Sequence, residues 1–244
     1  MQPRSSFVSL CLVRYPKGFA WLGLFSMAIH RLPLAINKHI SFFKLMGTGK
    51  GDAFDFRPDW NRWAMLCVHK NELPSFEPNA AVATHQLMND LFGGFIAGWY
   101  RLFKCNIQWL IMEVGTCHGK WNGQQPFFVQ KAAHDASENV AVLTRATIHF
   151  NSASRFWKHA AVFNEEMAKM PGLQFSMGMG EMPWLRQATF SIWENTDKMK
   201  NFAYQNLHHQ DVIQKTRNEA WYKEELFARM RIVHRSSHWN KAGF

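Results

Sequence analysis

Met46-Gly47-Thr48-Gly49 and Met177-Gly178-Met179-Gly180 are two copies of one Met-Gly-x-Gly motif in a chain of 244 residues. Each copy precedes a predicted strand, and that strand ends near a turn into a predicted helix. A match of four positions can arise by chance, but the elements around the two copies also follow the same order. The motif therefore indicates an internal repeat.

Hydrophobic periodicity predicts the same five elements, namely strand, helix, strand, strand and helix, around each copy of the motif. In the first half they cover residues 7–13, 19–34, 40–46, 62–69 and 79–91. In the second half they cover residues 140–150, 154–169, 174–180, 186–193 and 196–207.

A β-α-β-β-α unit forms an antiparallel sheet with helices on one face, so its other face needs a partner. We therefore expect an α+β fold in which two ferredoxin-like β-α-β-β-α repeats, fused in one chain, pack sheet to sheet as a dimeric α+β barrel. Residues 1–92 would form the first half and residues 140–244 the second. Residues 93–139 are rich in glycine and aromatic residues and lack a clean period, which predicts an irregular linker or lid with some helix or strand.

The composition indicates that the chain encloses something apolar. Hydrophobic residues make up 47% of the sequence, with 21 Phe and 11 Trp against only 4 Tyr. Large rings with few polar groups suit either a core or a pocket for an apolar ligand. This composition excludes global disorder.

Four cysteines are scattered without a CxxC pair, which predicts neither a disulfide framework nor a zinc knuckle: Cys11, Cys67, Cys105 and Cys117. Because the start of the chain lacks a continuous apolar stretch of signal-peptide type, we expect no export and a cytoplasmic protein. The longest apolar run, residues 18–29, is shorter than the roughly 20 residues of a membrane span, so we expect a buried or interfacial helix. A net charge of +10 permits contact with acidic membranes or nucleic acid, although the basic residues form no block.

The predicted strand at 186–193 has two different faces. Ala188, Phe190 and Ile192 alternate with Gln187, Thr189, Ser191 and Trp193. This alternation is typical of a strand with core on one side and a pocket wall on the other.

The predicted helix after this strand offers a candidate metal ligand. If the helix continues, Phe202, His209 and Ile213 share one stripe, whereas His208 points elsewhere. A neutral imidazole on a helix at the mouth of a barrel suits haem iron, and leaves the other axial position open for oxygen. A hydrogen-bonded core histidine is the alternative interpretation, and the choice between His209 and His208 stays open.

Several blocks of the sequence resemble the spheroidene monooxygenase family. They cover nearly the whole chain except residues 93–139: Phe43 to Gly49, Ala141 to Ile148, Phe175 to Glu181, Phe190 to Trp193, His209, and Glu219 to Arg229. The resemblance implies a haem-containing oxygenase that uses O2 and electrons from a reduced partner such as ferredoxin. Its implied substrate is an acyclic carotenoid, which is hydroxylated and then oxidised to a ketone.

The resemblance also implies a fold similar to the dimeric α+β barrels of haem-degrading monooxygenases and aldoxime dehydratases. In those relatives a helix-borne histidine holds the iron, and His209 is the matching position, on a C-terminal helix. We expect Arg145, Arg217 and Lys44 to be candidates for binding the haem propionates, since guanidinium binds carboxylate in a bidentate fork. Structural ion pairs are the alternative for these cations.

Three aromatic residues, Trp193, Phe190 and Trp221, are candidates for lining a pocket for a polyene, with plain core as the alternative. Cys11 and Cys67 lie in predicted strands, where we expect small buried hydrophobic residues rather than thiolate ligands. The glycines from Gly47 to Gly51 lack the spacing of a phosphate loop and predict a tight hairpin.

Two other functions remain open from the sequence. One is a haem-binding or haem-degrading protein of the same fold. The other is a binding module for single-stranded nucleic acid, which is disfavoured because the aromatic residues lie in apolar periodic runs. Because carotenoids dissolve in membranes, we also expect peripheral contact at the inner face of the membrane. The oligomeric state stays open.

Overall fold

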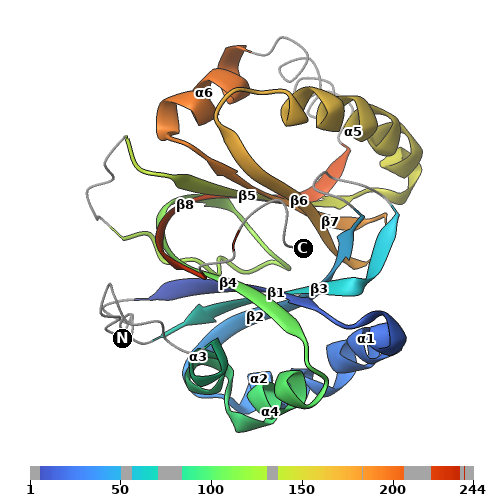
Figure 1. Ribbon diagram of the computed structural model, residues 1–244. Helices are drawn as coiled ribbons and strands as arrows, with labels where there is room; N and C mark the ends of the chain where they lie inside the picture. Colours follow the sequence, from blue (N-terminus) through green and yellow to red (C-terminus); the bar gives the residue numbers. More distant parts are fainter. Residues whose placement is uncertain are drawn as a thin grey trace.

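Eight antiparallel strands close into a barrel, with helices packed on two opposite sides (Figure 1). The computed structural model describes residues 6–50, 57–70, 84–130, 137–182, 184–205, 221–236 and 239. The strand order around the barrel is β1-β3-β2-β6-β7-β5-β8-β4. This architecture confirms the α+β barrel predicted from the sequence.

The first half contains four strands, four helices and a short 3-10 turn among its described residues. In chain order they are β1 (Phe7–Arg14), η1 (Lys17–Phe19), α1 (Ala20–Ile29), α2 (Arg31–Ile36), β2 (Ile40–Gly49), β3 (Pro58–His69), α3 (Thr84–Phe92), α4 (Gly94–Leu102) and β4 (Asn106–Gly119). The single helix expected over residues 19–34 is divided at His30. Pro33 explains the break, because proline has no N–H to continue the hydrogen bonds of α1 and is tolerated in the first turn of α2.

The second half repeats this order with fewer helices. It contains β5 (Val140–Ile148), η2 (Phe150–Ser152), α5 (Ala153–Ala168), β6 (Leu173–Met182), β7 (Arg186–Trp193), α6 (Thr196–Gln205) and β8 (Tyr222–Arg235). All three strands and both helices expected here are present, and β7 has the predicted bounds.

Each half has a fourth strand that the sequence did not reveal. Residues 93–139, where an irregular linker or lid was expected, contain α4 and the 14-residue strand β4. β4 is buried on both sides: Leu110 and Met112 point into the barrel, while Trp109 and Ile111 pack under the helices. A strand buried on both sides shows no alternation of polar and apolar residues, so its period is hidden. Each repeat is therefore β-α-β-β-α-β.

The two halves have the same strand order, β4-β1-β3-β2 and β8-β5-β7-β6, and meet where β2 pairs with β6 and β4 pairs with β8. Where β2 meets β6, Gly47 pairs with Gly180 and Thr48 pairs with Met179. Thr48 and Met179 are both the third residue of their motif copies, so equivalent residues face each other, as a two-fold axis requires. This pairing confirms the internal repeat.

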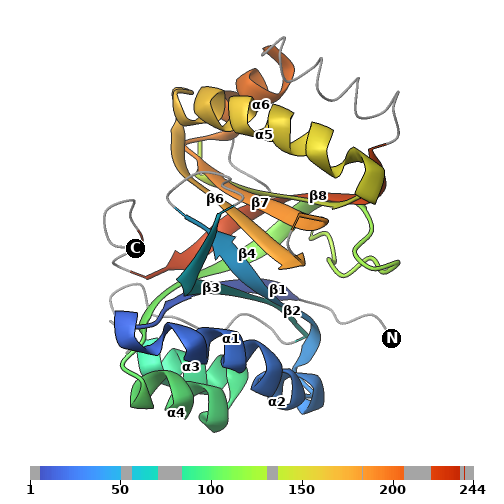
Figure 2. The same ribbon diagram turned by 90° about the vertical axis from the view of Figure 1, so that its right-hand side faces the viewer.

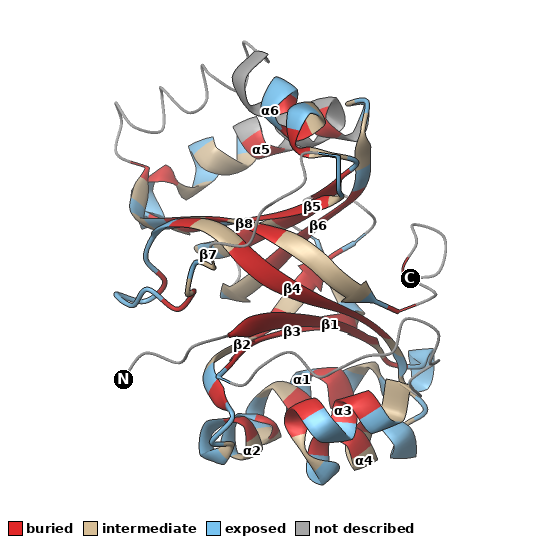
Figure 3. Ribbon diagram, turned by 90° about the vertical axis from the view of Figure 1, so that its left-hand side faces the viewer, coloured by how far each residue is buried: buried red, intermediate tan, exposed pale blue. Residues whose placement is uncertain are grey.

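The barrel interior is a packed apolar core to which every strand contributes. Leu10, Leu66, Leu110, Leu143 and Phe190 are fully buried there. Figure 3 shows the buried residues concentrated on the strands of the barrel. The interior is therefore filled by side chains rather than open to a ligand.

The chain after β4 folds back over one mouth of the barrel. Gly119 has a φ of +88°, the Lys120 N–H donates to the Glu225 carbonyl at 2.9 Å, and Trp121 is fully buried. A Cβ atom at Gly119 would lie 2.2 Å from the Glu225 carbonyl oxygen. This close approach of two backbones requires glycine.

We expect Gly119→Ala to lower the free energy of unfolding by about 3 kcal/mol, because it adds a backbone clash to a left-handed conformation. Gly123→Ala is the matched control: Gly123 has a φ of +75°, but a Cβ atom there would meet nothing within 4 Å. Its expected cost is only about 1 kcal/mol. Urea denaturation of the two variants measures the difference, and equal losses would show that the contact with Glu225 does not constrain the turn.

Candidate functional site

Four charged residues lie inside the barrel mouth beneath the Trp121 ring. We call them, together with Trp121, the mouth cluster: Lys44, Trp121, Arg145, Glu181 and Glu224. Lys44 Nζ donates to Glu181 Oε2 at 2.7 Å, and Trp121 Nε1 donates to Glu181 Oε1 at 2.6 Å. Arg145, which is 1% exposed, forms an ion pair with Glu224 and places its guanidinium 5.7 Å from the Trp121 ring centroid. The structure thus pairs both Lys44 and Arg145 with carboxylates of the protein.

Glu224 also fastens the turn that covers the mouth. It accepts the backbone N–H groups of Asn122 at 2.8 Å and Gly123 at 2.6 Å. Desolvation acts to raise the pKa of Glu224, but these two hydrogen bonds and the Arg145 guanidinium outweigh it and hold the pKa below its usual value. The carboxylate therefore stays ionised and keeps this end of the barrel closed.

The predicted aromatic candidates lie in different places. Phe190 points into the barrel core, whereas Trp193 points to the opposite side of β7 and stacks on Phe202 of α6, with ring centroids 5.0 Å apart. Trp221 is buried beside the end of β5, where its carbonyl accepts the His149 N–H at 2.9 Å. Trp193 is thus the one of the three that packs with α6.

The remaining sequence candidates, His209 and Arg217, lie outside the described residues. So does His208. All three belong to the segment that connects α6 with β8, and both of these elements belong to the second half.

The helix-facing sides of the two sheets differ sharply in the size of their side chains. Aligning the two Met-Gly-x-Gly copies makes Gly47 equivalent to Gly178. Starting from each of these glycines, the strand pairings define a row, which contains one residue from each strand of the half, paired side by side across the sheet. The first such row in the first half is Gly47, Trp63, Val13 and Ile107. Its equivalent in the second half is Gly178, Thr189, Thr144 and Phe227.

The neighbouring row shows the same contrast. In the first half it is Leu45, Met65, Cys11 and Trp109. In the second half it is Ser176, Ser191, Val142 and Arg229. Leu45, Trp63, Met65 and Trp109 of the first half are therefore replaced by the small or polar Ser176, Thr189, Ser191 and Arg229, whereas Ile107 is replaced by the larger Phe227.

The space that these side chains fill in the first half is tightly occupied. The Trp63 ring packs so closely against α1 that a Cβ atom at Gly23 would lie 2.0 Å from Trp63 Nε1. The residue equivalent to Trp63 in the second half is Thr189, which is only half-buried. We call the second-half residues of these two rows the second-half face: Val142, Thr144, Ser176, Gly178, Thr189, Ser191, Phe227 and Arg229.

Solvent reaches the middle of the second-half face. Thr144 is exposed although β5 is flanked by β7 and β8, with Thr189 and Phe227 as its paired neighbours. Helices α5 and α6 lie above this sheet (Figure 2), and Val140 and Val142 of β5 belong to one buried cluster with Met167 of α5 and Met199 of α6. Thr144 is therefore accessible from solvent in the middle of this face.

Two buried polar atoms on this face lack partners within the described part of the chain. They are Arg229 Nε and Ser176 Oγ. Leaving such atoms unsatisfied is costly, which favours a ligand that supplies a hydrogen-bond acceptor. Small side chains beside a half-buried guanidinium fit a flat apolar group that carries carboxylates.

Histidine and cysteine side chains elsewhere in the described residues form no such site. His30 and His69 are buried in the first half, and burial lowers the pKa of His30 to about 4 and that of His69 to about 3. Burial also raises the pKa of the Cys11 and Cys67 thiols well above the usual value, as expected for small hydrophobic residues rather than thiolate ligands. No group of three or more His, Cys, Asp or Glu in the described ranges is arranged to hold a metal ion.

Sequence reasoning missed most of the second-half face. The alternation in β7 predicted two different faces, and the structure places Thr189 and Ser191 on the helix-facing one. Arg229, Ser176 and Thr144 were not identified. Comparing the two repeats residue by residue from the Met-Gly-x-Gly motif would have revealed them, because that comparison shows where large residues become small.

No protein-family profile matches the chain. A spheroidene monooxygenase of Rhodobacter capsulatus is 30% identical over 236 residues, covering 95% of this chain and 92% of that protein. One of Cereibacter sphaeroides is 31% identical over 214 residues, covering 87% of this chain and 60% of that longer protein.

Among solved structures, an aldoxime dehydratase matches with a TM-score of 0.54 at 9% identity, covering 93% of this chain and 81% of that one. This similarity supports the fold alone. The sequence similarity to the Rhodobacter capsulatus protein extends over nearly the full length of both chains, through the repeat motif and both halves of the barrel. The chain belongs to the spheroidene monooxygenase family.

Proposed function

We propose that the protein is a haem-dependent monooxygenase that hydroxylates an apolar polyene, an acyclic carotenoid, and oxidises it further to a ketone. The reaction would use O2 and electrons from a reduced partner protein such as ferredoxin. Membership of the spheroidene monooxygenase family supports the reaction class. The observation that carries the cofactor assignment is the loss of bulky side chains from the second-half face.

The residues of the second-half face fit haem in both shape and charge. Thr144, Thr189 and Gly178 present small side chains or none to a flat macrocycle. The Arg229 guanidinium, whose Nε lacks a partner among the described residues, is suited to a propionate carboxylate. Arg217 is a second candidate partner for a propionate. Haem would supply the chemistry of oxygen activation that none of the twenty side chains provides.

His209 is the proposed axial ligand. It belongs to the segment that connects α6, which packs over the second-half sheet, with β8, which is a strand of that sheet. An imidazole is the common axial ligand of haem iron. The apolar cluster of Trp193, Phe202 and Met199 would exclude water from one side of the cofactor.

The substrate requires an apolar surface that orients it rather than polar groups that bind it. Phe227, half-buried on the second-half face beside Thr144, is the aromatic side chain best placed for this role among the described residues. Since carotenoids reside in membranes, the proposal includes peripheral contact with the inner face of a membrane.

The first test is the absorption spectrum of the protein loaded with haem, in the ferric, reduced and CO-bound states. We expect a Soret band at a stoichiometry of one haem per chain, which His209→Ala abolishes or shifts because the axial ligand is lost. His208→Ala is the matched control and should keep the wild-type spectrum.

Two results would contradict this proposal. A wild-type protein that shows no stoichiometric band under these conditions excludes the haem enzyme. Bleaching of the band during turnover with a reductant and O2 would instead indicate that haem is the substrate, as in a haem-degrading protein.

A second test uses the difference between the two halves. We expect Thr189→Trp, which introduces the side chain present at the equivalent Trp63, to reduce haem affinity by at least about 100-fold because the ring occupies the cofactor space. Thr189→Val keeps the side-chain volume and should bind haem like the wild type. Haem titration followed by absorption, together with thermal unfolding of the haem-free variants, separates blocked binding from loss of structure. Equal haem affinity in both variants would place the cofactor elsewhere.

A further inference from the structure

The helices of the first half expose an unusual amount of apolar surface. Eight of the thirteen exposed large hydrophobic side chains within the described ranges fall in residues 19–36 and 95–102, although these stretches make up a small part of the chain. They lie on α1, α2, α4 and the adjoining turn η1. Figure 1 shows these helices on the outer side of the first half, away from α5 and α6.

Helix α1 places its largest apolar residues outward. Trp21, Leu24 and Phe25 are 65%, 56% and 51% exposed, and their spacing puts them on one stripe. The buried residues of α1 are Leu22 and the smaller Gly23 and Ser26. A helix that only had to pack in water would have the opposite arrangement.

The outward residues of the helices form one continuous surface. The Phe25 ring lies 6.2 Å from Trp99 of α4, and Trp99 lies 4.7 Å from Phe103. Leu32 and Ile36 of α2, 68% and 73% exposed, extend the surface further. We define the outer face as Trp21, Leu24, Phe25, Leu32, Ile36 and Phe95. An exposed apolar surface of this kind marks an interaction site.

Apart from Asp90 on α3, the charged residues described on the first-half helices and their connections are positive. The sequence contains no Asp or Glu in residues 1–51 or in residues 91–112. Exposed Lys17 and Arg31 border α1, Lys38 follows α2, and Arg101 and Lys104 end α4. Apolar residues surrounded by cations complement a bilayer that contains anionic lipids.

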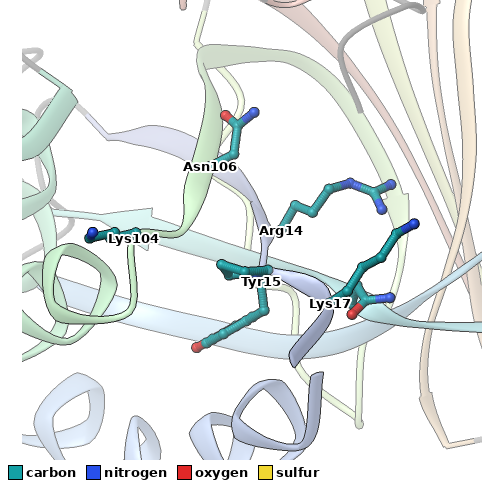
Figure 4. Close-up of a pocket in the computed structure, with 7 residues that line it drawn as sticks. Arg14, Tyr15, Lys17, Lys104 and Asn106 are labelled. Carbon is teal, nitrogen blue, oxygen red and sulfur yellow. The ribbon is translucent and has the colours of Figure 1, made fainter. Parts of the chain in front are cut away.

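A basic pocket lies at the edge of this surface. It has a volume of about 260 Å³ and is lined in part by Arg14, Lys17 and Lys104, together with Asn61 and Asn106 (Figure 4). Lys17 begins η1, immediately before α1, and Lys104 follows α4, so the pocket adjoins two of the three helices of the outer face. Arg14 is paired with Asp59 at 3.2 Å, and Lys104 points away from Arg14 and Lys17 (Figure 4), so Lys17 and Lys104 add positive charge along the edge of the outer face.

We propose that the outer face docks the protein on the surface of a bilayer containing anionic phospholipids. Trp21, Phe25 and their neighbours enter the boundary between headgroups and acyl chains, while the surrounding Lys and Arg side chains contact the phosphates. This inference rests on the proposed function and deepens it. It assigns the surface that binds the membrane in which the proposed carotenoid substrate is dissolved. Its evidence does not involve haem.

The outer face lies on the membrane rather than crossing it. Lys17–Ile36 is the one candidate span among the described residues, with 20 residues and a mean hydropathy of 1.4. However, this stretch is divided at His30, whose buried ring lies 3.3 Å from the Tyr100 hydroxyl, and Leu22 is buried in the first-half core. A transmembrane orientation would remove these residues from the core, whereas surface docking keeps them in place.

Flotation with vesicles tests the inference directly. The wild-type protein should float with vesicles of phosphatidylcholine and phosphatidylglycerol, more weakly with phosphatidylcholine alone, and less at high salt. The double variant Trp21→Glu/Phe25→Glu should bind at least about tenfold more weakly. It replaces two rings that enter the bilayer with charges that anionic lipids repel. Lys17→Glu/Lys104→Glu should lose the preference for phosphatidylglycerol without changing the apolar residues.

Phe150→Glu is the matched control, because Phe150 is 82% exposed but lies on the second half. It should float like the wild type. Circular dichroism of each variant confirms folding. The inference is overturned if the wild type floats with neither vesicle or if Trp21→Glu/Phe25→Glu floats unchanged. It is also overturned if that variant instead converts a dimer into a monomer by light scattering, since the face is then an interface between copies.

Haem spectra of the same samples separate this inference from the proposed function. Trp21→Glu/Phe25→Glu should keep the wild-type Soret band while losing flotation. A wild type that floats but lacks haem would contradict the proposed cofactor and leave the docking surface supported.

Discussion

Closure of the barrel between β2 and β6 is the constraint on which the rest of the structure depends. A sheet covered by helices on one side still exposes an apolar side, and only a second sheet can bury it. Gly47 pairs with Gly180 at this seam, and a Cβ atom at Gly47 would lie 4.0 Å from the Gly180 carbonyl oxygen. The glycines of the repeated motif therefore stand where the two halves approach each other. The motif is conspicuous in the sequence because it forms the contact around the two-fold axis.

Closure makes the inner sides of the two sheets a shared core, which leaves their outer sides free to differ. The first half keeps Leu45, Trp63, Met65 and Trp109 under its helices, whereas the second half has Ser176, Thr189, Ser191 and Arg229. Each buried apolar side chain contributes about 1.5–3 kcal/mol. Four such losses are comparable with the whole stability of a domain, so the second half depends on its seams with the first.

Strands with one buried and one polar side were predicted from their alternating hydrophobicity. Strands with two buried sides lack that alternation and were missed. The alternation of Ala188, Phe190 and Ile192 predicted β7 with the bounds that the structure has. β4 appeared irregular because both of its sides are buried. β8 contains many residues that favour helices, such as Glu, Leu, Ala and Arg, but it forms a strand because it pairs with β4 and β5. Arg145 and Lys44 were predicted as partners of carboxylates, with structural ion pairs as the alternative, but the carboxylates they contact come from strands distant in sequence. Spacing alone cannot reveal such pairs.

A single fused chain explains why one outer side is open and the other is packed. In a symmetric dimer each substitution occurs twice, so removing large residues from one outer side would remove them from both. In one chain Trp63 remains against Gly23 of α1 while its equivalent is Thr189, and the two sides become independent. They also lie on opposite sides of the barrel (Figure 1). The proposed docking of the outer face and the proposed binding of a cofactor at the second-half face therefore do not compete for the same surface.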